Sequence, residues 1–233
     1  MIEDEFFVPT MGLTASPYIT SGDFTGSHHL LRYEWALKSI ANLIPSGKIL
    51  DAACGSGFGS YMIARQFPIA KVTGVDYDPK AINFAQKSFA APNLQYQQGD
   101  LTLWQETIGS AIYDCIVSFD TIEHVSHREI AFENLVNHLH PDGSLLLSTP
   151  CGSPTNNLKP DWEYHKIEFS TASLYDFLKR YFKKVIAPDS SEFPNRGVFD
   201  QLNGSKVSYL LRLNPVICQI PITIDNPYRL TSE

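Results

Sequence analysis

Residues 49–60 read ILDAACGSGFGS, and this segment constrains the fold of the 233-residue chain more than any other. It starts with an apolar run typical of a buried strand, continues through an aspartate, and passes three glycines before a helical pattern begins. Glycines at such a place permit a tight turn and let a ligand approach the backbone closely. The segment therefore predicts a strand, a ligand-binding loop and a helix in succession.

Downstream, short apolar runs alternate with segments of helical periodicity. The apolar runs are too uniform to leave one face wet, which indicates a parallel sheet covered by helices on both sides. We expect strands at residues 48–53, 71–75, 94–97, 114–119 and 144–149. We expect helices at residues 28–44, 58–66, 79–89, 101–107, 128–140 and 170–181.

Two further strands, at residues 184–187 and 206–213, follow each other without a helix between them. Consecutive strands of this kind pair antiparallel, and here they would close one edge of the sheet. The predicted fold class is therefore α/β. We expect a Rossmann-like, doubly wound, mostly parallel seven-stranded sheet with an antiparallel edge strand and helices on both faces.

A chain of 233 residues builds one sizeable hydrophobic core, so we expect a single domain over residues 28–233. Residues 1–27 contain prolines and glycines that break any regular period, and we expect them to form a lid or extension. Loops that contact the substrate are expected at about residues 150–170 and 188–205.

Composition argues against several classes of partner. The chain has 25 acidic and 18 basic residues, and its net charge of −7 disfavours a nucleic-acid partner. The four cysteines form no CxxC pair, so neither a zinc site nor a disulfide framework is expected. No apolar run predicts a membrane span, and the acidic N-terminus lacks a signal-peptide stretch. We expect a cytoplasmic protein, either a monomer or a homodimer.

The aspartate before the glycine loop separates two kinds of cofactor. Asp51 lies four residues before Gly55, near the place where a dinucleotide would put its pyrophosphate. Two anions repel each other there, whereas a carboxylate attracts the ammonium and sulfonium groups of S-adenosyl-L-methionine. Ser60 also occupies the position where a dinucleotide fingerprint has its third glycine or alanine. The pattern favours S-adenosyl-L-methionine over a nicotinamide cofactor.

Two further acids follow the next strands of the predicted sheet. Asp76 comes 21 residues after Gly55, where a carboxylate can accept both hydroxyls of a ribose. We expect Tyr77 to lie against the adenine, Asp100 to accept the adenine amino group, and Leu101 to contact the adenine face. A helix-capping role is the alternative for Asp100.

These motifs, at residues 49–60, 74–79, 98–101 and 113–125, resemble those of class I S-adenosylmethionine-dependent methyltransferases. The resemblance spans about residues 30–185. It is greatest with the small-molecule branch, which includes ubiquinone-pathway O-methyltransferases and many natural-product and sugar methyltransferases. It implies S-adenosyl-L-methionine as cofactor and S-adenosyl-L-homocysteine as product. The cofactor residues it implies are Asp51, Ala53, Gly55, Gly57, Asp76, Tyr77, Asp100, Leu101 and Phe119, to which we add Ser56 and Tyr33.

Methyl transfer is a direct displacement, so the protein has to align the nucleophile with the methyl group and exclude water. A hydroxyl acceptor of high pKa also needs a base, for which histidine is the usual residue. His124 follows the fourth strand and is expected at the methyl end of the cofactor. His165, in the loop before the last helix, is a second candidate base. A structural role is the alternative for both histidines.

In the ubiquinone-pathway enzymes, a segment similar to residues 120–124 is linked to a divalent metal. That resemblance would make Asp120, Glu123 and His124 a magnesium site. However, Asp120 replaces the usual glutamate of those enzymes, and the two residues that follow it cannot ligate as acids do. We therefore expect no metal.

The N-terminal segment is rich in aromatic rings, and we expect it to close over cofactor and acceptor, with Tyr18 or Tyr33 reaching the methionine end. Simple docking on the core is the alternative. The aromatic set comprises Phe6, Phe7, Tyr18, Phe24, His28, His29 and Tyr33.

The predicted function is methyl transfer from S-adenosyl-L-methionine to a hydroxyl of a small molecule such as a natural product, a sugar or a quinone-like compound. Small-molecule N-methylation is the first alternative. A nicotinamide- or nucleotide-sugar-dependent enzyme and a cofactor-binding protein without catalysis are more distant ones. A nucleophilic Cys151, as in pyrimidine-C5 methylation, is not favoured because no cationic residue flanks it closely.

Overall fold

The computed structural model describes residues 6–153, 155–160, 163–186 and 215–222. Its main sheet consists of β1 (Lys48–Ala52), β2 (Lys71–Asp76), β3 (Leu94–Gln98), β4 (Tyr113–Phe119), β5 (Leu139–Ser148), β8 (Phe182–Ile186) and β9 (Val216–Pro221). Two short strands, β6 (Cys151–Ser153) and β7 (Phe169–Ser170), pair separately. The helices are α1 (Ala15–Ser21), α2 (Phe24–Leu43), α3 (Phe58–Gln66), α4 (Pro79–Ser88), α5 (Trp104–Thr107), α6 (Arg128–Asn137) and α7 (Thr171–Tyr181).

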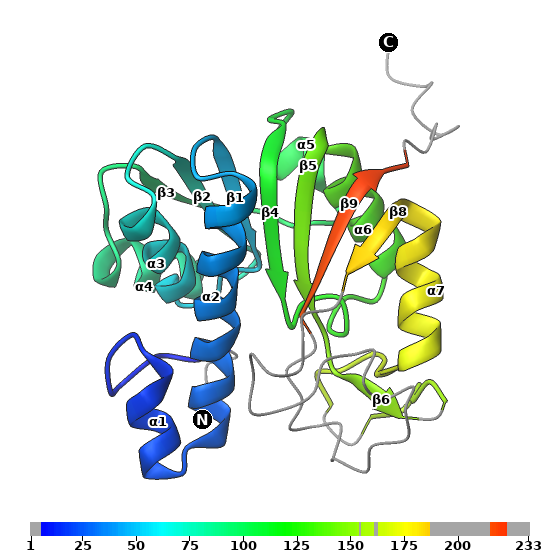
Figure 1. Cartoon of the computed structure of the whole chain (residues 1–233), viewed down its shortest axis with the longest axis horizontal. Helices are drawn as coiled ribbons and strands as arrows, with labels where there is room; N and C mark the ends of the chain where they lie inside the picture. The colour runs from blue at the N-terminus through cyan, green and yellow to red at the C-terminus, as the bar shows by residue number, and fades with distance from the viewer. Residues whose placement is uncertain (1–5, 154, 161–162, 187–214, 223–233) are drawn as a thin grey trace.

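The strands of the main sheet lie in the order β3-β2-β1-β4-β5-β9-β8. The first five strands pair in parallel, whereas β9 is antiparallel to both β5 and β8. The predicted seven-stranded, mostly parallel α/β sheet with antiparallel pairing at one edge is confirmed. The chain builds outward from β1 to β3 and then crosses to β4, so the strand order switches between β1 and β4 (Figure 1).

Hydrophobic side chains on successive residues point to opposite faces of this sheet. Ile49, Cys115 and Val117 belong to a buried cluster with residues of α2 and α3. Leu50 and Ile116 belong to a second cluster with residues of α5, α6 and α7. Both faces of β1 and β4 are therefore covered, which explains why these central strands read as continuous apolar runs without a polar face.

Local capping fixes where several helices begin. The Asp23 side chain accepts a hydrogen bond from the Gly26 amide at the start of α2, and Ser170 caps α7 through the Ser173 amide. Asp78 caps α4, whose first residue is a proline that needs no hydrogen-bond partner for its nitrogen. The Asp23 and Ser170 caps span three residues and the Asp78 cap spans two, and both spacings are ordinary at helix starts.

The N-terminal stretch is more regular than its prolines and glycines predicted. Residues 15–21 form α1, and α2 starts at Phe24 rather than at residue 28. Pro17 is tolerated because it lies in the first turn of α1, where backbone N–H groups have no helical partner. Gly22 ends α1 with φ 80°, and the buried Tyr18 anchors the helix.

Two expectations for the C-terminal part, the substrate loop at residues 188–205 and the strand at 206–213, lie outside the described residues. The described antiparallel strand is instead β9. None of the described helices is both long and apolar enough to cross a membrane.

Candidate cofactor and acceptor site

The carboxyl ends of the parallel strands meet at the end of the molecule where α1 and β6 also lie (Figure 1). The strand register pairs Asp51 with Val117 and Asp76 with Gln98. The acids that end β1 and β2, the residues that follow β3 and the end of β4 therefore reach the same edge of the sheet. In open α/β sheets, ligands bind at this edge, beside the point where the strand order switches.

Asp51 is fully buried at the switch point and accepts hydrogen bonds from two neighbouring elements. Ser60 Oγ of α3 donates to Oδ2 at 2.6 Å, and Tyr33 Oη of α2 donates to Oδ1 at 3.0 Å. Burial raises the pKa of Asp51 to about 6, although these two hydrogen bonds act in the opposite direction. The carboxylate is therefore ionised at neutral pH, and a nearby cation would stabilise it.

The glycine loop uses backbone conformations that few side chains permit. Gly55 and Gly57 have positive φ angles of 53° and 84°, and Ala53 has a φ of 61°. A Cβ on Gly57 would lie 2.6 Å from the Cβ of Ala85, so α4 also requires a glycine at that position. The loop can therefore turn tightly from β1 into α3.

Asp76 is buried at the end of β2 and holds the glycine loop in place. Its Oδ2 accepts from the Gly55 amide at 2.8 Å and its Oδ1 from the Asp78 amide at 3.0 Å. Burial raises the pKa of Asp76 above its usual range, and these backbone hydrogen bonds oppose the rise. Each carboxylate oxygen can accept two hydrogen bonds, so Asp76 can still accept hydrogen bonds from the hydroxyls of a ribose. The adjacent Tyr77 is 61% exposed.

The residues after β3 form a compact turn. Asp100 Oδ1 accepts from the amide and the hydroxyl of Thr102, each at 2.7 Å, so Asp100 has a local structural function as well. Leu101 is buried, and its carbonyl accepts from Asn134 Nδ2. The turn is therefore fixed from both sides before any ligand binds.

Aromatic rings surround the end of β4 and the start of α3. The Phe119 ring packs edge-on against Tyr33, with centroids 5.2 Å apart, and Tyr33 packs against Phe58 at 5.0 Å. A Cβ on Gly59 would lie 2.0 Å from Cζ of Tyr33, so the missing side chain of Gly59 makes room for this ring. Tyr33 reaches Asp51 only because of that close approach.

The N-terminal segment lies against the glycine loop. Ser56 Oγ donates to the Phe7 carbonyl at 2.6 Å, and a Cβ on Gly55 would lie 3.2 Å from the Cβ of Phe6. The Phe7 ring stacks on His29 with centroids 4.8 Å apart. This arrangement brings residues 6 and 7 to the predicted cofactor loop.

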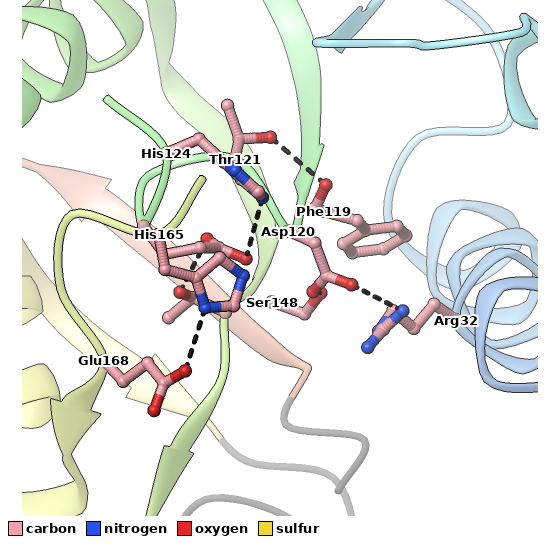
Figure 2. A network of polar contacts seen from close by, with 10 residues as sticks. Arg32, Phe119, Asp120, Thr121, His124, Ser148, His165 and Glu168 are labelled. Carbon is pink, nitrogen blue, oxygen red and sulfur yellow. Dashed lines mark hydrogen bonds and ion pairs between the residues drawn. The ribbon is translucent and has the colours of Figure 1, made fainter. Parts of the chain in front are cut away.

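Arg32 of α2 forms an ion pair with Asp120, just past the end of β4 (Figure 2). Its Nη1 lies 2.7 Å from Oδ2 of Asp120, and Ser148 Oγ donates to the other carboxylate oxygen at 3.1 Å. Asp120 has a φ of 48°, a conformation that is uncommon for residues other than glycine. Burial, together with the neighbouring Arg32 guanidinium, lowers the pKa of His28 to about 4.

A cluster of two carboxylates and two imidazoles lies beside this ion pair (Figure 2). His165 Nδ1 lies 2.9 Å from Oε1 of the buried Glu168, and the His165 ring meets His124 edge-on with centroids 4.8 Å apart. Glu123 Oε1 lies 3.9 Å from Nε2 of His124. We call these four residues, Glu123, His124, His165 and Glu168, the acceptor cluster.

Glu123 is the most deeply buried residue of the acceptor cluster, with no exposed surface. Thr149 Oγ1 donates to its Oε2 at 2.7 Å, whereas Oε1 has no hydrogen-bond partner. Burial raises the pKa of Glu123 well above its usual range, and the nearby Asp120 carboxylate adds to this rise. A positive charge placed beside Glu123 would therefore favour the ionised form of its carboxyl group.

The structure brings together residues that the sequence analysis treated separately. His124 and His165, proposed there as independent bases, are in ring contact. Asp120, proposed there beside Glu123 and His124, is bound by Arg32. Arg32, Thr149 and Glu168 were missed, and only Glu168 had a sequence signal, namely an acid three residues after a candidate histidine.

Part of the chain matches a known protein family. A family model described as a methyltransferase domain matches residues 49–143, which run from β1 into β5. The segment from β1 into β5 is therefore similar to a methyltransferase domain.

Two curated relatives extend the comparison. The chain is 32% identical to phosphoethanolamine N-methyltransferase 1 of Arabidopsis thaliana over 127 residues, which are 54% of this chain and 25% of that protein. It is 32% identical to trans-aconitate 2-methyltransferase of Rhizobium meliloti over 108 residues, which are 46% of this chain and 40% of that protein. The chain thus spans well under two thirds of the length of these relatives.

A solved structure has the same fold at low sequence identity. It is the O-methyltransferase of a trans-AT PKS multienzyme from Brevibacillus brevis in complex with S-adenosyl-L-homocysteine. The two structures agree with a TM-score of 0.57 at 18% identity, over 78% of this chain and 64% of that chain.

Proposed function

We propose that this protein transfers a methyl group from S-adenosyl-L-methionine to a hydroxyl group of a small molecule. The family supports the cofactor, and the relatives named above support a small acceptor. Their names include both an N-methyltransferase and an O-methyltransferase, so they do not choose between nitrogen and oxygen. The choice of a hydroxyl rests on the acceptor cluster.

The observation that carries this choice is the contact between His165 and Glu168. A carboxylate only accepts hydrogen bonds, so Glu168 favours the tautomer with a proton on Nδ1 of His165 and a lone pair on Nε2. A buried carboxylate also stabilises the imidazolium that forms when Nε2 takes a proton. An imidazole supported in this way suits an acceptor that must lose a proton, as a hydroxyl must.

The remaining residues bind, orient and exclude water. We assign Asp76 to the ribose and Asp51 to the cationic end of the cofactor, with Ser60 and Tyr33 holding the Asp51 carboxylate in place. When bound, S-adenosyl-L-methionine supplies an electrophilic methyl group. The acceptor cluster then takes the hydroxyl proton, and the aromatic rings around Phe119 keep water away from the reacting atoms.

Binding measurements test the cofactor. Calorimetry of the whole chain should show micromolar binding of S-adenosyl-L-homocysteine and no response to NAD. The Asp76→Ala variant should bind about 100-fold more weakly, because it loses two hydrogen bonds to a charged group. Binding of NAD alone would contradict the proposed cofactor. Full affinity in the Asp76→Ala variant would contradict the ribose assignment.

A labelling experiment tests the acceptor atom. The protein would be incubated with S-adenosyl-L-methionine carrying a deuterated methyl group and with paired small molecules that differ only by a hydroxyl or an amine. We expect the label on oxygen. Transfer to the amine members alone would favour the N-methyltransferase alternative instead.

A further inference from the structure

We propose that Glu123, His124 and His165 bind one divalent transition-metal ion. The ion site itself follows from the positions of these side chains. Its use in methyl transfer, where it would bind the oxygen of the acceptor, rests on the function proposed above. No metal was expected from the sequence, and the alternative set of ligands contained Asp120 rather than His165.

The three side chains already lie close to the distances that an ion requires. One candidate ligand atom from each of Glu123, His124 and His165 lies within 4.8 Å of the other two. In a tetrahedral site with bonds of about 2.1 Å, ligand atoms are about 3.4 Å apart. Shifts of up to about 1.4 Å would bring the three atoms to that distance, and the His124 side chain, which is 33% exposed, has room to move.

The Glu168 carboxylate prepares His165 for metal binding. Histidines that ligate metals almost always donate their second ring N–H to a carboxylate, a carbonyl or water. Glu168 accepts in this way at 2.9 Å from Nδ1, which leaves Nε2 as the ligand atom of His165. A buried glutamate three residues from the histidine therefore fixes both the tautomer and the direction of the ring.

Glu123 supplies an oxygen that lacks a partner. Its side chain is fully buried, its Oε2 accepts from Thr149, and its Oε1 makes no hydrogen bond. Leaving a buried carboxylate oxygen without a partner is unfavourable, and a cation at this position would satisfy it. The partnerless oxygen is the Glu123 atom that lies toward His124.

The donor set indicates the kind of ion. Asp120 is held by Arg32 at 2.7 Å, so it does not take part. Two imidazole nitrogens and one carboxylate oxygen suit zinc, cobalt, iron or manganese, whereas calcium and magnesium prefer oxygen ligands. Three protein ligands leave a position open, as in catalytic zinc sites. An acceptor hydroxyl bound there would have a lowered pKa and would release its proton to solvent water, so the ion would replace the imidazoles in the task assigned to them above.

Metal titration of the whole chain tests this site. The protein would be dialysed against a chelator and titrated with CoCl2, followed by visible absorption, and with ZnCl2, followed by calorimetry. We expect one ion per chain. His124→Ala and His165→Ala should each weaken binding at least 100-fold, and Glu168→Gln should weaken it about 10- to 100-fold.

Two control variants separate this site from general binding of metal to the surface. His140→Ala removes a half-exposed histidine elsewhere, and Asp120→Asn removes the acid that pairs with Arg32. Both should keep the affinity of the unchanged protein, and circular dichroism would verify that all variants fold. Absence of binding, or binding that survives both histidine substitutions in folded protein, would overturn the proposal.

The two proposals fail separately. Protein that binds S-adenosyl-L-homocysteine but no metal would remove only the ion site. Protein that binds cobalt through this cluster but does not bind S-adenosyl-L-homocysteine would remove only the proposed methyl transfer.

Discussion

At the scale of single residues, burial decides how the site responds to pH. Asp51 lies in a fully buried position and keeps its charge only with help from Ser60 and Tyr33. A charge held this way makes the folded protein less stable than it would be with a neutral side chain. The arrangement is reasonable for a residue that has to meet a cationic ligand.

We predict that Asp51→Asn changes the slope of stability against pH. The folded pKa is about 6 and the ordinary value is 3.8, so the folded state holds its proton more strongly than the unfolded chain does. Wild-type stability from this group therefore falls as pH rises from about 4 to 6. Relative to wild type, the variant should gain about 3 kcal/mol across that window, measured by denaturant unfolding at several pH values.

The matched control is Asp142→Asn, the same chemical change at a side chain that is 95% exposed. It should leave the slope unchanged. Lost hydrogen bonds in Asp51→Asn shift stability equally at every pH, so only the slope reports on ionisation. An identical slope in wild type and Asp51→Asn would show that the buried carboxyl does not titrate in this range.

We also predict that, in protein freed of metal by a chelator, His165→Ala lowers kcat by about 100- to 10,000-fold with little change in KM, because it removes the proton acceptor rather than a binding contact. Added imidazole should restore part of the activity, which a merely structural histidine would not allow. The measurement is formation of S-adenosyl-L-homocysteine with an acceptor identified by labelling. His140→Ala serves as the control, and activity equal to wild type in His165→Ala would exclude the proposed role.

At the scale of elements, the contact between α2 and α3 depends on one absent side chain. Gly59 faces the Tyr33 ring, and a Cβ there would lie within 2.0 Å of it. Tyr33 in turn positions Asp51. The packing of two helices therefore supports the carboxylate at the end of β1.

We predict that Gly59→Ala destabilises the protein by about 1–3 kcal/mol, even though alanine is the better helix former. The reason is that the Tyr33 ring has to move and its hydrogen bond to Asp51 is lost. In a Tyr33→Ala background, the same substitution should be neutral or stabilising, because the space is then empty. Equal effects in both backgrounds, measured by chemical unfolding, would contradict this account.

Sequence patterns predicted the regular elements well where one local rule determined them. The helix expected at residues 58–66 matches α3, and the strand expected at 48–53 matches β1 within one residue. α1 was missed because proline and glycine were taken as breakers, although Pro17 occupies a harmless first-turn position. The expected helix at residues 128–140 was too long, because residues 139 and 140 belong to β5.

The site was predictable only in part, because several of its contacts join residues that are far apart in the sequence. The acids after the strands follow from position in the sheet, and they do reach one edge. The contacts of Arg32 with Asp120 and of Thr149 with Glu123 join residues 88 and 26 positions apart, so no periodic pattern reveals them. The meeting of His124 with His165 likewise depends on how a long loop folds back.

At the scale of the whole molecule, the N-terminal segment and the strand ends enclose the predicted cofactor position from two sides. Phe7 is anchored by His29 and by the Ser56 hydroxyl, so residues 6 and 7 lie on the glycine loop. A ligand bound there would contact parts of the chain that are far apart in sequence. Binding of the ligand should therefore raise the free energy of unfolding of the whole domain rather than order one loop alone.

We predict that S-adenosyl-L-homocysteine at 100 times its Kd stabilises the protein by about 2.7 kcal/mol and raises Tm by about 5–10 °C. Phe7→Ala should speed dissociation of the ligand in stopped-flow measurements, because the segment over the loop loses its anchor. Ile69→Ala, at a side chain that is 77% exposed, is the control. Unchanged dissociation in Phe7→Ala would show that the segment does not retain the cofactor.

The switch of strand order between β1 and β4 has a consequence for how the acceptor specificity of this fold can change in evolution. The half built from β1, β2 and β3 carries most of the predicted methyl-donor residues, whereas the loop after β4 and the loop before α7 carry the acceptor cluster. The halves meet along the β1–β4 pair. Substitutions in the acceptor half can therefore accumulate without disturbing Asp76 or the glycine loop. A lineage with this fold is free to exchange its acceptor while it inherits the same methyl donor.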